Sequence, residues 1–100
     1  MAIEIYQVRG NAQAIINTLD KLTTQERKQG VTMHGAQELN KLIGLAKEVA
    51  PDVDDRAWPA QIRIEDTGMG VQVFASLLDV ENAARQILAL VPPPIQVGAL

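Results

Sequence analysis

The sequence predicts a small α+β domain, in which a small antiparallel sheet packs against two or three helices. Two observations carry this prediction. Apolar residues recur at helical spacing over 12–22, 33–50 and 80–91, as on one face of an amphipathic helix. Residues 61–65 and 71–77 alternate apolar and polar side chains, as half-buried strands do, and a glycine-containing turn separates them.

Length, composition and charge limit the classes of protein to which this chain can belong. We expect one domain over 1–100, since 100 residues are too few for two independent cores. With 47% hydrophobic and 21% charged residues, a folded state is favoured over disorder. The lack of cysteine and of a signal-peptide pattern predicts a cytoplasmic protein. The net charge of −3 argues against nucleic-acid partners, and the lack of an apolar stretch of about 20 residues argues against membrane insertion.

The N-terminal segment 2–8 is predicted to be a strand, because β-branched and aromatic residues are frequent in it. Ile5 and Tyr6 are adjacent, so the alternation is imperfect. A bulge near Tyr6, or burial of both faces, would reconcile the pattern with a strand. Residues 9–11 then predict a turn, with Asn11 as the N-cap of the helix over 12–22.

A second helix start follows closely. Thr23 and Glu26 form a capping-box pattern, which predicts a short helix that ends at Gly30. The alternative is that the preceding helix continues to about Gln29.

The helix over 33–50 is expected to end before Pro51, whose ring cannot continue the hydrogen-bond ladder. Residues 52–59 are polar and acidic, and they predict a loop that holds one helical turn at 54–57. Trp58 is the expected anchor of this loop.

The two alternating segments predict a β-hairpin, joined by the turn at 66–70. Phe74 falls on its outward face, between Gln72 and Ser76, and Asp79 is the predicted N-cap of the helix over 80–91. The buried face of the hairpin is predicted to consist of Ile62, Ile64, Val71, Val73, Ala75 and Leu77.

The predicted order is therefore β-α-α-β-β-α. Residues 92–100 follow as a proline-led tail or as an edge strand. If this tail pairs with the sheet, the order approximates a ferredoxin-like βαββαβ plan whose first helix is expanded into two.

Residue types that carry catalysis are scarce. The chain has one serine, Ser76, and one histidine, His34, so triad chemistry and a zinc site lack their groups. The acidic segment 52–55 suggests a hard-cation site, but an EF-hand loop that starts there has Ala57 and Arg63 where Gly and Glu are needed. We expect no catalytic residue, no metal ligand and no cofactor, and we favour a protein that is not an enzyme.

The stretch 62–71, IRIEDTGMGV, resembles the adenine-contacting box of histidine-kinase-type ATPases. The resemblance implies that Asp66 contacts adenine, that Gly68 and Gly70 let the chain approach the nucleotide, and that 39–43 corresponds to the family's Asn-bearing helix. It covers about ten residues, and the rest of the chain is too short for the family's lid and second glycine-rich box. A hairpin turn explains the same residues without a ligand, so a nucleotide- or metabolite-binding domain is the alternative function.

Segment 22–27, LTTQER, is similar to the opening of some helix-turn-helix DNA-binding proteins. A reading helix presents basic and amide side chains to bases and phosphates. In the helix that follows, the acidic side chains of Glu38 and Glu48 accompany Asn40 and Lys41 and would repel phosphates. The capping box already explains the motif. Nucleic-acid binding is therefore disfavoured.

Apolar residues without an obvious place in the core favour a protein that acts by association. Phe74 on the outward face of the hairpin, together with Ile95, Val97 and Leu100 of the tail, is the expected interface. The expected partner is the protein itself, in a homo-oligomer, or another protein. The alternative is that a helix covers Phe74 and that the tail packs within the molecule.

Overall fold

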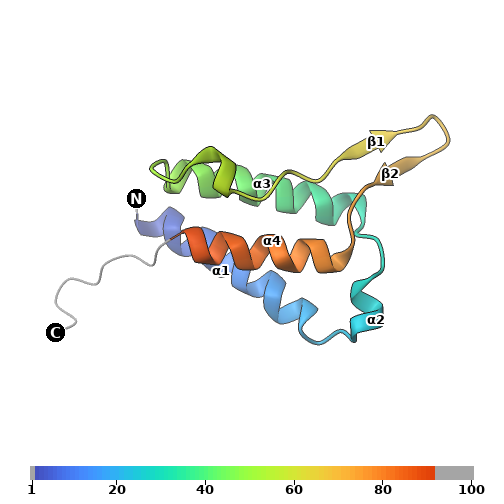
Figure 1. The fold of residues 1–100 in the computed structure, drawn as a ribbon, viewed down its shortest axis with the longest axis horizontal. Helices are drawn as coiled ribbons and strands as arrows, with labels where there is room; N and C mark the ends of the chain where they lie inside the picture. Colours follow the sequence, from blue (N-terminus) through green and yellow to red (C-terminus); the bar gives the residue numbers. More distant parts are fainter. Residues whose placement is uncertain (1, 92–100) are drawn as a thin grey trace.

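The computed structural model describes residues 2–91, and within them three long helices form a bundle from which a β-hairpin extends (Figure 1). The two strands are antiparallel neighbours. The predicted α+β class is thus confirmed. In chain order the elements are α1 (Ala2–Leu19), the one-turn α2 (Thr24–Arg27), α3 (Met33–Val49), a 3-10 turn (Asp55–Ala57), β1 (Ile64–Asp66), β2 (Val71–Val73) and α4 (Leu77–Leu90).

The predicted N-terminal strand is wrong, because α1 is helical from Ala2 to Leu19. Val8, Ala12, Ile16 and Leu19 are all buried, at spacings of four, four and three residues, so one helical stripe includes the segment predicted to be a strand. Burial of this stripe outweighs the local β-propensity. The predicted turn and the N-cap at Asn11 lie inside α1, and the ferredoxin-like order, which needs a strand at 2–8, is lost.

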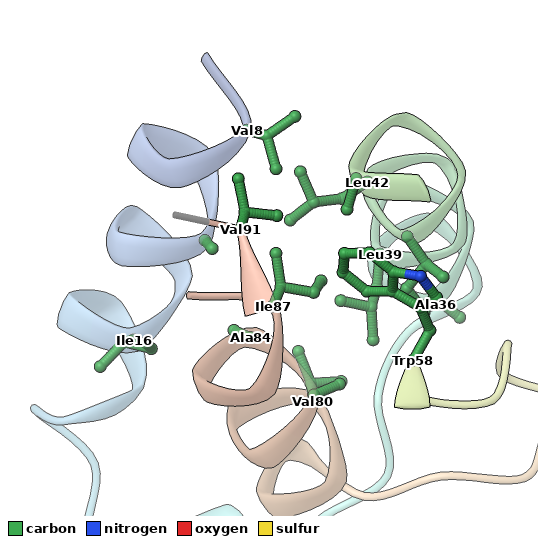
Figure 2. Close-up of a cluster of buried hydrophobic side chains, with 14 of the residues drawn as sticks. Val8, Ile16, Ala36, Leu39, Leu42, Trp58, Val80, Ala84, Ile87 and Val91 are labelled. Atoms are coloured by element: carbon green, nitrogen blue, oxygen red, sulfur yellow. The ribbon is translucent and has the colours of Figure 1, made fainter. Parts of the chain in front are cut away.

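The core lies between α1, α3 and α4, and Figure 2 shows side chains of all three helices meeting with Trp58. Trp58 is buried, which confirms it as the anchor of the loop. The Arg9 side chain of α1 donates to the main-chain oxygens of Leu88, at 3.0 Å, and of Val91, and so binds unsatisfied carbonyls at the end of α4. The largest side chains that are fully buried are those of Val8, Leu39, Ile43, Ile87 and Val91.

The capping box at Thr23 and Glu26 is confirmed. It begins α2, which ends at Arg27 rather than at Gly30, and the alternative of one continuous helix is wrong because α1 ends at Leu19. The helix predicted over 33–50 and the turn predicted at 54–57 are both present, as α3 and the 3-10 turn.

Ion pairs connect the C-terminal end of α1 with α2 and α4. The carboxylate of Glu81, buried on α4, lies 3.4 Å from Arg27 and 3.1 Å from Arg85. Asp20 lies 3.2 Å from Arg85 and 3.6 Å from Arg27. Two carboxylates and two guanidinium groups thus compensate one another where α2 packs on the bundle.

The N-cap of α4 is Ser76, and the prediction that Asp79 is the N-cap is wrong. The Ser76 hydroxyl accepts from the Asp79 N–H at 3.2 Å, and the Asp79 carboxylate accepts from the Ser76 N–H at 2.8 Å. This capping box starts the helix at Leu77. The predicted strand 71–77 is therefore shortened to Val71–Val73.

Candidate interaction surface on the hairpin

The hairpin arm, defined as residues 63–74, depends on two glycines at its turn. Gly68 has φ +80° and Gly70 has φ +143°, a backbone region that residues with a Cβ rarely adopt. The Thr67 N–H donates to the Gly70 carbonyl at 2.9 Å, and the Asp66 carboxylate accepts from the Gly68 N–H at 2.9 Å. The predicted hairpin and its turn are confirmed.

Both sides of the arm's base are held by the bundle. On the β1 side, the Asn40 amide of α3 accepts from the Ile62 N–H at 2.7 Å and donates to the Ile62 carbonyl at 3.1 Å. On the β2 side, the Val31 N–H donates to the Ala75 carbonyl at 3.1 Å. One side-chain amide and one extended segment thus take the places that neighbouring strands would occupy.

The inward face of the hairpin was predicted correctly except at its two ends, because Leu77, although partly buried, is the first residue of α4 and not part of the hairpin. Ile62, Ile64, Val73 and Ala75 are partly buried and pack against the core cluster. Val71, predicted to be buried with them, is 49% exposed. The arm extends past the bundle, so no helix is available to cover the residues near its tip (Figure 1).

The outward face carries Phe74, as predicted, and its side chain is 46% exposed, so α4 beside it covers the ring only in part. The Arg63 guanidinium lies over the Phe74 ring, 4.9 Å from its centroid, and also pairs with Glu65. Met69, at the tip, is 99% exposed. Three exposed apolar side chains therefore lie within one short protruding segment, a composition typical of contact surfaces.

The main chain of the arm has two open edges. The strand register pairs Ile64 with Val73 and Asp66 with Val71, and the Phe74 N–H donates to the Arg63 carbonyl. Because hydrogen-bonded pairs alternate in an antiparallel ladder, the N–H and C=O groups of those two pairs point outward. Among the described residues none of these outward groups has a protein partner.

The residues predicted for nucleotide binding lie at the exposed tip. None of the three pockets described below includes Asp66, Gly68 or Gly70, and the Asp66 carboxylate is engaged within its own turn. The structure does not test a nucleotide, so this alternative stays a prediction. Ile95, Val97 and Leu100, the other predicted interface residues, lie outside the described residues.

The pockets on the described surface include three open ones, of about 400 Å³ each. One reaches the base of the arm, where Arg63 and Phe74 face Asn82 and Gln86 of α4. Another lies between α1 and α3, and the most apolar lies beside Val31. Residues 2–91 hold no group of three or more metal-ligating side chains.

Sequence reasoning missed two contributors to this surface. In the sequence, Asn40 stands out only within the resemblances to a nucleotide-binding or DNA-binding helix, and its clamp on Ile62 joins residues 22 positions apart, so no local pattern indicates it. Met69 was treated only as part of a turn. Its apolar side chain between two glycines is a local signal of an exposed hydrophobic tip.

Comparison with family models, curated proteins and solved structures found no match to this chain. In the described part of the chain, no helix has both the length and the apolar character that crossing a membrane requires.

Proposed function

We propose that this protein acts by self-association, with the hairpin arm as the contact surface and a second copy of the chain as the partner. The observation that carries the proposal is the arm itself, which protrudes from the bundle with open main-chain edges and with Met69, Val71 and Phe74 exposed. Apolar surface of this kind is removed from water by association.

Self-pairing is favoured over an unrelated partner by the arm's chemistry. Residues 69–76 carry no charge, so two copies of this segment approach without like-charge repulsion. A contact made by one short strand edge and a few apolar side chains is expected to bury less than the roughly 1,200 Å² of a standard interface, and we therefore expect a weak, concentration-dependent dimer. The tail residues Ile95, Val97 and Leu100 remain part of the proposal as a second contact.

The test is light scattering over a concentration series into the millimolar range. Val71→Lys places a charge on the arm, and Leu45→Lys is the matched control, because Leu45 on α3 is 41% exposed. We expect the unmodified chain and Leu45→Lys to dimerise alike, and Val71→Lys to stay monomeric. A wild-type chain that is monomeric throughout would overturn the proposal, and so would a Val71→Lys chain that dimerises normally.

A further inference from the structure

Each of the two edges of the arm leaves the outward main-chain groups of two residues without a partner. On β1, the groups of Ile64 and Asp66 are free, but the Asn40 side chain already occupies the next position, Ile62. On β2, the groups of Val71 and Val73 are free, and Val31 occupies the next position, Ala75. Each edge thus offers one short stretch of unpaired main chain between the turn and the bundle.

Charge distinguishes the two edges. β1 and the residue before it carry Arg63, Glu65 and Asp66, and charged side chains on an edge strand oppose pairing with another chain. β2 has no charged residue, and Gln72 at its centre is neutral. The edge of β2 therefore has no charged side chain that would oppose pairing with another chain.

We infer that two copies pair through β2 about a two-fold axis at Gln72, to form a four-stranded antiparallel sheet ordered β1-β2-β2′-β1′. This inference rests on the proposed self-association and specifies its geometry. In this register Val71 lies opposite Val73 of the second copy, and the outward groups of both residues form four hydrogen bonds between the copies. Gln72 faces its own equivalent, and Phe74 faces the second copy's Gly70, whose lack of a side chain leaves room for the ring.

Neighbouring registers fit less well. Centring the pair on Val73 would place Val71 opposite Ala75, whose carbonyl already accepts from Val31. Centring it on Val71 would place Val73 opposite Met69, which lies in the turn rather than in a strand. A symmetric pairing also closes on itself, whereas pairing of β2 with β1 of the next copy would continue as an open filament.

Single cysteines test the geometry directly, because the chain has none of its own. Gln72→Cys brings two thiols together at a non-hydrogen-bonded pair, where the Cα atoms are about 4.5 Å apart and a disulfide is allowed. Glu65→Cys is the matched control, since Glu65 is the cross-strand partner of Gln72 on the same face. In a glutathione redox buffer we expect Gln72→Cys to form disulfide dimers at least about ten times faster than Glu65→Cys does.

A second pair of variants removes one hydrogen-bond donor per copy. Val73→Pro deletes an outward N–H of β2 and leaves the ladder within the hairpin intact, and Ile64→Pro does the same on β1. Val73→Pro is expected to raise the dimer Kd about tenfold or more, and Ile64→Pro to leave it near the wild-type value. Circular dichroism verifies that both variants are folded.

The outcomes separate this inference from the proposed function. Faster cross-linking of Gln72→Cys together with the loss caused by Val73→Pro supports both. A dimer in light scattering that cross-links faster through Glu65→Cys, or through neither cysteine, overturns the β2 pairing and leaves self-association standing. A monomer that forms no cross-link through Gln72→Cys overturns both.

Discussion

The helical bundle and the hairpin arm hold their shapes by different means. In the bundle, side chains such as Ile43 and Ile87 are wholly buried between three helices. In the arm, the shape depends on main-chain hydrogen bonds, on two glycines at the turn and on the Asn40 clamp at the base. The difference teaches that the bundle supplies the stability of the fold, while the arm presents surface that the fold does not itself cover.

The largest expected difference between the regions is in the cost of removing side-chain volume. Ile87→Ala leaves a cavity at a fully buried position and is expected to lower the free energy of unfolding by about 2–5 kcal/mol. Val71→Ala, in the exposed part of the arm, is expected to change it by no more than about 0.5 kcal/mol. Urea unfolding followed by circular dichroism measures both. Similar losses of unfolding free energy in the two variants would show that the arm contributes to stability as much as the buried core does.

The junction between the two regions should respond to loss of the Asn40 clamp. Asn40→Ala leaves the Ile62 N–H and C=O without their partner, and we expect a loss of about 1–3 kcal/mol. Amide hydrogen exchange should accelerate in the arm more than in α1. Gln37→Ala, at an exposed position on α3, is the control and should change neither quantity. Uniform acceleration across the chain would mean that the clamp is not specific to the arm.

The smallest effect is expected at α2, which is not part of the arm. Hydrogen bonds from the Thr23 backbone and hydroxyl hold the pKa of Glu26 below its ordinary value of 4.5. A carboxylate with a lowered folded-state pKa adds stability above its unfolded pKa, and this contribution is lost as the pH falls through the folded value. Wild type should therefore lose more unfolding free energy than Glu26→Gln between about pH 7 and about pH 3. Equal losses would contradict a role for the charge of Glu26.

Much of the arm and of α3 was predictable, because their signals are local. The capping residues, the alternation on both sides of the turn and the glycines at 68 and 70 each specify the conformation of their own neighbours. Phe74 was placed on the outward face for the same reason. The reach of the arm beyond the bundle was not predictable, because it depends on where the ends of α3 and α4 lie in space.

The start of α1 shows why local propensity failed elsewhere. Ile5 and Tyr6 favour a strand when the segment is considered alone. Val8 and Ala12 are nevertheless buried in the core, where α1 packs mainly against α4, and this burial outweighs the local preference. The N-cap of α4 was misplaced by three residues, since Ser76 and Asp79 are both good caps and form one reciprocal pair. In both cases a contact with another segment, or between two candidate residues, decided the outcome.

The sequence by itself determined the α+β class, the helix over 33–50, the capping box at Thr23, the hairpin turn and the scarcity of catalytic groups, because each depends on residue type and short-range spacing. Only the tertiary structure decided that residues 2–8 are helical, that Asn40 clamps Ile62 and that the outer edge of β2 is open. Those features arise from burial and hydrogen bonding between segments far apart in the chain, which no local pattern encodes.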